Sequence, residues 1–246
     1  MALIHSFEKS GNTLFRRRGP MPVILFILAV PVTYFTNYSY LSNGITIALS
    51  ISAVVISIIG FLIRAYAIAT TPKGTSGRNT KEQVAESLNT SGIYSVVRHP
   101  LYLGNYLMWI GIVMFTFNIY FFFIVSLAFW LYYERIMFAE ERFLEKKFGD
   151  VYLDWSKTVP AFIPSFKNYK KKEILFSFKS VLRREYSGVL ATALGFAFID
   201  LLRLYFIEKR IEWQRVSVYA VIVAFLLVII LRTFKHAGLL NEEGRS

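Results

Sequence analysis

The sequence predicts an all-α membrane protein, a polytopic bundle of about six transmembrane helices with both termini in the cytoplasm. Three observations lead to this fold class. The 246 residues are 55% hydrophobic with a mean hydropathy of +0.46, more apolar than a typical soluble domain. The apolar residues form runs close to the roughly 20 residues that a helix needs to cross a bilayer. Basic residues gather at alternate ends of these runs, as they do on the cytoplasmic side of membranes.

The spans follow one another in two groups, with a long polar stretch between the fourth and the fifth. The first follows Arg16, Arg17 and Arg18 without a small-residue cleavage pattern, so it is expected to be a retained span and not a cleaved signal peptide. The fifth contains Asp200 and Arg203, which share a helix face and are expected to neutralise each other in part. The six spans are expected at Met21–Tyr38, Ile45–Ala69, Leu101–Phe115, Ile119–Tyr133, Gly188–Ile207 and Val216–Leu231.

The distribution of Lys and Arg between the spans predicts the orientation. Residues 135–186 contain twelve basic and seven acidic residues, and residues 1–20 contain four basic residues and one acidic residue. The turns at 37–44 and 116–118 contain none of either. With an even number of spans, both termini, the 70–93 loop and the 135–186 segment are therefore expected in the cytoplasm. The bacterial inner membrane is the expected location.

The composition excludes several classes of function. The absence of cysteine excludes disulfides, thiolate catalysis and cysteine-ligated metals, and His5, His99 and His236 are too scattered to predict a metal site. No glycine-rich loop follows a strand, so no Rossmann or P-loop nucleotide site is indicated. A nucleic-acid partner is not expected, because no folded polar domain remains to bind it.

The formal net charge of +12 has two interpretations. It can be the ordinary basic flank of a membrane protein, or it can hold anionic lipid head groups, since each basic residue near a negative leaflet contributes about 1 kcal/mol. The second interpretation rests on a basic group made of Lys170, Lys171, Lys172, Lys179, Arg183 and Arg184.

Two polar clusters adjoin consecutive predicted spans. Charged groups at membrane depth cost roughly 2.5–3.5 kcal/mol each, so such clusters indicate function. His99-Pro100 begins a helix, whose free N–H groups suit an anion. Glu140 and Glu141 follow the next span, where one carboxylate can bind a cation, although a solvated amphipathic helix over Glu140–Phe148 also explains them. Both clusters are expected at the same cytoplasmic surface.

These motifs resemble the superfamily of isoprenylcysteine carboxyl methyltransferases and phospholipid methyltransferases, which are integral membrane enzymes. The family pattern is an Arg-His-Pro-x-Tyr-x-Gly box, a helical hairpin, a Glu-Glu pair, and then Leu, Phe-Gly, Tyr and a Val-Pro…Ile-Pro tail. The resemblance covers about residues 79–165. The matching residues are Arg98, His99, Pro100, Tyr102, Gly104, Glu140, Glu141, Leu144, Phe148, Gly149, Tyr152, Val159, Pro160, Ile163 and Pro164.

The resemblance implies a site for S-adenosylmethionine, converted to S-adenosylhomocysteine, without a Rossmann domain. Glu140 or Glu141 would suit the sulfonium and ammonium groups of this cofactor, and the helix start with His99 or Arg98 would suit its carboxylate. The cofactor-binding residues implied by position are Glu86, Ser87, Leu88, Asn89, Tyr94, His99, Pro100, Leu101, Tyr102 and Glu140.

Arg98, Arg135 and Glu141 are the catalytic candidates. One of them departs from the family pattern, because the substrate-side arginine of the family lies four residues before the first glutamate. Ile136 occupies that position here, and Arg135 lies one residue earlier. A shift of one residue rotates a side chain by about 100° around an α-helix.

The resemblance and the basic bias together predict methylation of a membrane lipid, foremost O-methylation of a lipid phosphate such as that of lipid A. An anionic acceptor needs a cation and no base, whereas an amine must lose a proton. The alternatives are N-methylation of phosphatidylethanolamine and carboxyl methylation of a prenylated cysteine, and a non-enzymatic membrane scaffold or transporter-like protein. The expected division is an N-terminal helix pair (1–70), a methyltransferase core (71–166) and a basic segment with the last helix pair (167–246).

Overall fold

The computed structural model describes residues 2–19, 21–72, 74–75, 83–172 and 174–245. Within these ranges the secondary structure is entirely helical. The α-helices are α1 (Leu3–Arg16), α2 (Met21–Phe35), α3 (Asn43–Ala69), α4 (Pro100–Met114), α5 (Ile119–Phe148), α6 (Asp150–Thr158), α7 (Phe178–Glu208) and α8 (Val216–His236), with a short 3₁₀ helix η1 (Gly92–Ser95) before α4.

The predicted all-α membrane fold is confirmed. Helices α3, α5, α7 and α8 are long and apolar enough to cross a bilayer. Helices α2 and α4 are also apolar but have 15 residues each, a length of about 22 Å at 1.5 Å per residue. These six helices correspond to the six predicted spans.

The largest differences from the predicted spans are in α5 and α7, which are both longer than predicted. Helix α5 continues beyond Tyr133 to Phe148, because the charged residues of its last turns find partners, as in the ion pair of Arg142 with Glu145 at 2.6 Å. Helix α7 begins at Phe178 instead of Gly188, because the hydroxyl of Ser177 accepts a hydrogen bond from the Ser180 N–H and caps the helix. Lys179, Arg183 and Arg184 are therefore helical, whereas Lys170, Lys171 and Lys172 are not.

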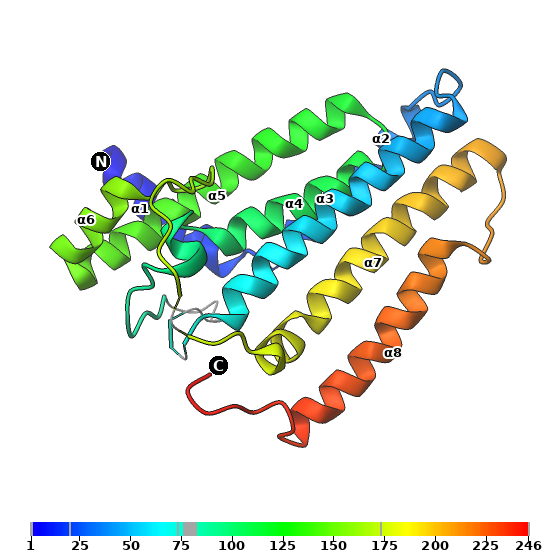
Figure 1. The fold of residues 1–246 in the computed structure, drawn as a ribbon. Coiled ribbons are helices and arrows are strands. Elements are labelled where there is room, and N and C mark those ends of the chain that lie inside the picture. Colours follow the sequence, from blue (N-terminus) through cyan, green and yellow to red (C-terminus); the bar gives the residue numbers. More distant parts are fainter. Residues whose placement is uncertain (1, 20, 73, 76–82, 173, 246) are drawn as a thin grey trace.

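Helix α3 lies between α4 and α7, and α8 packs on the outer side of α7 (Figure 1). The connections 36–42 and 209–215 lie at one end of this bundle, and η1, α6 and both chain ends lie at the other (Figure 1). This arrangement agrees with the predicted common side of the two termini. Which membrane face they occupy stays a prediction, as does the division into three parts.

Small residues form the seam between α3 and α4. A Cβ atom at Gly60 would lie 2.6 Å from the carbonyl oxygen of Gly104, and one at Gly111 would lie 2.5 Å from that of Ala53. The hydroxyl of Ser57 donates to the carbonyl of Met108 across the same seam at 2.9 Å. Close backbone approach of this kind is a general way to pack membrane helices.

The polar residues of α7 do not pair as predicted. Asp200 accepts hydrogen bonds from Arg215 at 2.6 Å and from Ser217 at 2.7 Å, and these residues begin α8. Arg203 donates instead to the carbonyl of Phe115, where α4 ends, at 3.0 Å. The carbonyls at a helix end have no partner within the helix, so Arg203 satisfies one of them. Asp200 and Arg203 thus join α7 to two different helices.

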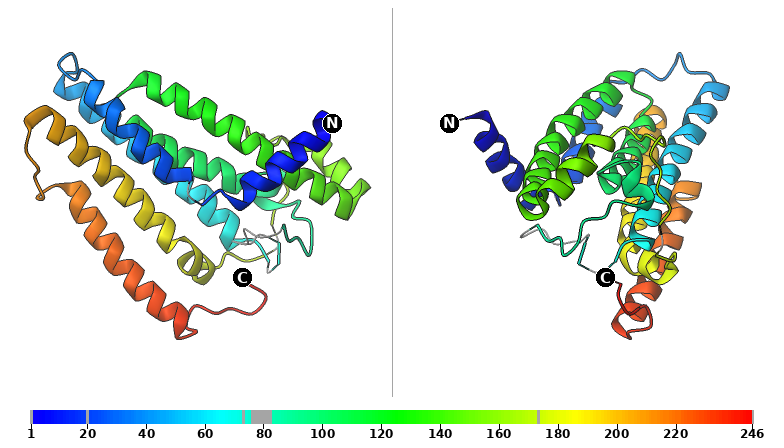
Figure 2. Two further views of the ribbon diagram at one scale, coloured as in Figure 1. Left: turned by 180° about the vertical axis from the view of Figure 1, so that it is seen from behind. Right: turned by 60° about the vertical axis from the view of Figure 1, so that its left-hand side comes forward.

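Helix α1 was not predicted and crosses the carboxyl-terminal half of α5 (Figure 2). Gly11 packs against the backbone of Arg135, and Glu8 forms an ion pair with Lys146. The guanidinium of Arg135 lies 3.3 Å above the centre of the Phe7 ring. Leu3 remains exposed, as in amphipathic helices that lie in a membrane interface.

The α3–α4 seam makes a stability prediction. Gly60→Ala should destabilise the protein by about 1–3 kcal/mol, because the new methyl group overlaps backbone atoms of α4. Gly44→Ala is the matched control, since a Cβ there meets no atom within 4 Å and alanine favours the helix. Thermal melting in detergent should show a lower midpoint for the first variant alone. Equal midpoints would mean that the seam tolerates a side chain.

Candidate active site

A cavity of about 510 Å³ lies at the end of the bundle that carries η1 and α6. Sites for small molecules usually have volumes of this order. His99 and Pro100 at the start of α4 line it, and so do Glu140 and Glu141 on α5. The two polar clusters that adjoin consecutive predicted spans therefore meet in one cavity.

Glu141 connects the start of α4 to α5. Its Oε1 accepts hydrogen bonds from Arg98 Nε at 2.9 Å and lies 2.9 Å from His99 Nε2. Its Oε2 lies 3.3 Å from Arg98 Nη2, so the guanidinium contacts both oxygens. Paired contacts between arginine and a carboxylate fix orientation as well as distance. The alternative, a solvated Glu141 paired with lysine neighbours, does not describe this geometry.

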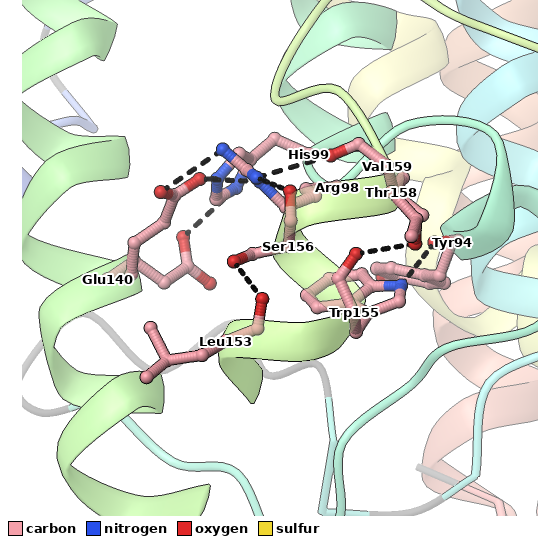
Figure 3. Close-up of polar contacts among 10 residues, drawn as sticks. Tyr94, Arg98, His99, Glu140, Leu153, Trp155, Ser156, Thr158 and Val159 are labelled. Carbon is pink, nitrogen blue, oxygen red and sulfur yellow. Dashed lines mark hydrogen bonds and ion pairs between the residues drawn. The ribbon is translucent and has the colours of Figure 1, made fainter. Parts of the chain in front are cut away.

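Arg98 also holds the segment after α6. Its Nη1 donates to the carbonyls of Ser156 at 2.6 Å and Val159 at 3.2 Å, and its backbone N–H donates to Pro160 at 2.9 Å. Figure 3 shows Arg98 between the carboxylates of α5 and the end of α6. All three guanidinium nitrogens of Arg98 therefore have protein partners. This arrangement favours a structural role over the predicted catalytic one.

Glu140 has a different environment from its neighbour. Its Oε2 atom is buried and has no hydrogen-bond partner within the described ranges. The nearest charged partner is His99, whose Nδ1 lies 3.8 Å away (Figure 3). A buried carboxylate oxygen without a partner is costly, by about 1–3 kcal/mol or more, and a cationic ligand would remove that cost. Glu140 is thus the group in the cavity best suited to positive charge.

Tyr94 closes the cavity on the side of η1. Burial, with the negative charge of Glu140, raises the pKa of Tyr94 to about 12. The phenol therefore stays protonated at neutral pH and can donate a hydrogen bond. The indole N–H of Trp155 donates to the Tyr94 carbonyl at 3.1 Å and fixes η1 against α6 (Figure 3). Burial likewise raises the pKa of Tyr152 above its usual range.

Tyr102 packs against the ring of His99. Its ring stacks on His99 with a centroid separation of 5.6 Å and contacts Tyr133 at 5.0 Å. Its hydroxyl accepts a hydrogen bond from Arg18 Nη1 at 3.3 Å. The residues that follow α1 therefore reach the cavity, and the histidine ring is held between a tyrosine and a carboxylate.

A second polar cluster lies in the same cavity. Arg64 of α3 donates from Nε and Nη2 to the carboxylate of Glu185 on α7, at 2.9 and 2.6 Å. Its Nη1 donates to Asn105 Oδ1 at 2.5 Å. Glu185 is 2% exposed, so this ion pair is buried on the α7 side. A Cβ at Gly104 would overlap the Arg64 side chain, which explains a glycine at this position of the box.

Most of the predicted cofactor residues line the cavity. The exception is Glu86, whose N–H donates to the Gly74 carbonyl at 3.0 Å outside the lining. The lining residues from the prediction, with two of its catalytic candidates, are Ser87, Leu88, Asn89, Tyr94, Arg98, His99, Pro100, Leu101, Tyr102, Glu140 and Glu141.

Arg135 does not line the cavity but faces α1, as described above. The one-residue offset explains this, because the helix presents Ile136 where the family places its arginine. Ile136 is completely buried. The interpretation of Arg135 as a catalytic candidate therefore lacks support from its position.

Sequence reasoning missed the second cluster. Arg64 could have been recognised from the sequence. It is the single charged residue of the predicted span Ile45–Ala69, and such residues are rarely without a function. Glu185 could not have been recognised in this way, because it precedes the predicted fifth span within a polar stretch. The lining residues that were missed include Arg18, Arg64, Asn105, Glu185 and Ser187, whereas Arg184 belongs to the basic group predicted to hold anionic head groups.

Comparison with known proteins concerns at most about half of the chain. Residues 44–151 match the family described as phospholipid methyltransferase. This part of the chain is also similar to isoprenylcysteine methyltransferases. The matched segment contains α3 except its first residue, η1, α4 and all of α5, and it ends at the start of α6, before α7. The box and the Glu pair lie inside this segment, whereas Glu185 lies outside it.

Individual relatives agree with this match. A protein-S-isoprenylcysteine O-methyltransferase of Schizosaccharomyces pombe is 32% identical over 44% of this chain and 48% of that protein. The cobalt-zinc-cadmium resistance protein CzcN of Cupriavidus metallidurans is 36% identical over 34% and 38%, respectively. A protein-S-isoprenylcysteine O-methyltransferase of Mus musculus is 34% identical over 34% and 30%. The chain thus matches between about a third and a half of these relatives' length. No solved structure matches the chain.

The Glu141 network predicts a difference between two glutamates of α5. Glu141→Ala should lower the free energy of unfolding by about 1.5–3 kcal/mol, because it leaves Arg98 and His99 without their acceptor. Glu145→Ala is the matched control one turn later, where loss of the half-exposed pair with Arg142 should cost less than about 0.5 kcal/mol. Unfolding by sodium dodecyl sulfate would measure both. Equal costs would contradict the assigned role of Glu141.

Proposed function

We propose that this protein transfers a methyl group from S-adenosylmethionine to an anionic head group in the membrane. The observation that carries the proposal is the buried Oε2 of Glu140 beside the start of α4, which has no hydrogen-bond partner among the described residues. Both lie within the segment that matches the methyltransferase family. That cavity would lie at the cytoplasmic face of a bacterial inner membrane, according to the charge distribution of the sequence.

The cavity residues fit the charges of this cofactor. Glu140 would face the sulfonium and ammonium groups, since its buried oxygen needs a cationic partner. The amino end of α4 at Pro100, together with His99, would hold the carboxylate, because the helix dipole favours an anion there. Leu88, Asn89 and the protonated Tyr94 would enclose the rest. S-adenosylhomocysteine would occupy the same place after transfer.

The partners of the three cavity glutamates favour an oxyanion as the methyl acceptor. When bound, the cofactor supplies an electrophilic methyl group, and its sulfur leaves with the bonding electron pair as the new O–CH₃ bond forms. An oxyanion therefore needs no base, only orientation. Glu141 and Glu185 are both engaged by arginines, and Glu140 faces the cofactor. An amine acceptor would find no free carboxylate for its proton among the described residues of the lining.

Two oxyanions have this chemistry. A lipid phosphate such as that of lipid A is the acceptor favoured by the basic flank, and the carboxylate of a prenylated cysteine is the acceptor named for several relatives. N-methylation of phosphatidylethanolamine is the alternative from a different acceptor class. A membrane scaffold or transporter-like protein is the non-enzymatic alternative, and it would not bind the cofactor.

Cofactor binding makes the first prediction of the proposal. S-adenosylhomocysteine should raise the melting midpoint of the purified protein, because a ligand at 100 times its dissociation constant contributes about 2.7 kcal/mol. Glu140→Gln should weaken that binding about tenfold or more and leave the unliganded midpoint nearly unchanged. Glu134→Gln, earlier on α5 and outside the cavity lining, is the control and should bind normally. If S-adenosylhomocysteine did not change the melting midpoint of the wild-type protein, the proposed enzymatic function would be wrong.

The acceptor class makes the second prediction. Protein in phosphatidylcholine nanodiscs is incubated with methyl-labelled S-adenosylmethionine and, separately, phosphatidic acid, a farnesylated cysteine, phosphatidylethanolamine and a total bacterial lipid extract. Label should enter an oxyanion acceptor as its methyl ester, identified by chromatography of the lipid products. Label in the phosphatidic acid and label in the farnesylated cysteine distinguish a phosphate acceptor from a carboxylate acceptor. Label confined to phosphatidylethanolamine would contradict an oxyanion acceptor.

A further inference from the structure

The cavity extends along one face of α4. His99, Tyr102, Asn105 and Trp109 follow one another at three- and four-residue spacing, and all of them line the cavity. At 1.5 Å per residue, Asn105 lies about 9 Å and Trp109 about 15 Å further along the helix than His99. The Glu140 cluster therefore lies at one end of the cavity, and the cluster of Arg64, Asn105 and Glu185 lies further into the bundle.

Arg64 keeps donors available on this deeper wall. A guanidinium has five N–H groups. Three of them are used in the bonds to Glu185 and Asn105. Two N–H groups, one on Nη1 and one on Nη2, have no acceptor among the described residues. The side chain is 18% exposed, whereas Glu185 behind it is 2% exposed, so the accessible part of the pair is the guanidinium.

The charges around Arg64 favour an anion. Glu185 neutralises Arg64, and Arg184 from the same turn of α7 and Arg18 after α1 also line the cavity. These two arginines add positive charge to the cavity wall. Pro22, Trp109 and Gly188 complete the wall with apolar surface, which suits a lipid that brings its head group in from the bilayer.

We propose that Arg64, oriented by Glu185 and Asn105, binds the oxyanion of the methyl acceptor, and that α7 thereby sets the acceptor class of this protein. The inference rests on the proposed function and adds the residues of the acceptor subsite. Arg64 touches the acceptor, whereas Glu185 and Asn105 are positioning residues. Arg64 and Asn105 lie inside the segment matched by the family, whereas Glu185 lies on α7 outside it, so the family match does not supply the carboxylate that orients Arg64.

Stability alone does not account for the buried pair. Replacing both members of a buried ion pair by apolar residues is often neutral or stabilising, so such a pair is weak evidence for a purely structural role. The paired glutamate also selects orientation, because it accepts from Nε and Nη2 and turns the remaining donors away from α7. A lysine at position 64 would keep the charge and lose this forked geometry.

The test compares Arg64→Lys and the double variant Arg64→Met with Glu185→Met. Arg203→Lys is the matched control, because Arg203 is also an arginine buried in the bundle but does not line the cavity. Each full-length protein is placed in phosphatidylcholine nanodiscs and loaded with S-adenosylhomocysteine. Binding of phosphatidic acid and of a farnesylated cysteine is measured by thermal shift, and KM and kcat are measured for whichever of the two is methylated.

Arg64→Lys should weaken acceptor binding and raise the acceptor KM about tenfold or more, with the shift by S-adenosylhomocysteine unchanged. The double variant should fold, bind S-adenosylhomocysteine and lose acceptor binding. Arg203→Lys should melt earlier than wild type with an unchanged acceptor KM. An unchanged KM in Arg64→Lys, or an equal loss of cofactor binding, would overturn the subsite. So would a wild-type protein that binds neither anionic probe, whereas failure to bind S-adenosylhomocysteine would instead refute the proposed function.

Discussion

The carboxylate of Glu141 is the contact on which the site depends. It joins Arg98 and His99, two consecutive residues before α4, to a single point on α5. Through Arg98 the same contact reaches the end of α6. Glu141 contacts both Arg98 and His99, whereas Oε2 of the adjacent Glu140 has no hydrogen-bond partner among the described residues. The two neighbouring glutamates thus differ: Glu141 connects α5 to the start of α4, and Glu140 faces the cavity.

A second constraint comes from the close approach of α3 and α4. Their small-residue seam brings Arg64 past Gly104, directly beside the box, and α7 then supplies the partner for its charge. The cavity consequently has a wall from the family segment and a wall from a helix outside it. Such an arrangement allows the part that handles the methyl donor to stay constant while the other wall changes.

Hydropathy and motif spacing were sufficient to predict the helices and the meeting of the box with the Glu pair. They predicted the fold because apolar runs report directly on membrane burial. Contacts such as that between Arg64 and Glu185, 121 residues apart, leave no periodic signal in one sequence. Arg135 shows the opposite case. The sequence nearly matches the family motif, but the arginine lies one residue too early, so its side chain faces α1. Helix α1 itself was missed because it is amphipathic and not continuously apolar.

The short length of α2 has a consequence for the surrounding lipid. Its 15 residues reach about 22 Å, whereas a bilayer core is about 30 Å thick. Such a hydrophobic mismatch is relieved when the adjacent leaflets become locally thinner. Pro22 at the start of α2 lines the cavity, so the thinned annulus would border its mouth. Lipids in that annulus would carry their polar ends several ångströms nearer to the mid-plane, which shortens the distance that a head group must travel to be modified.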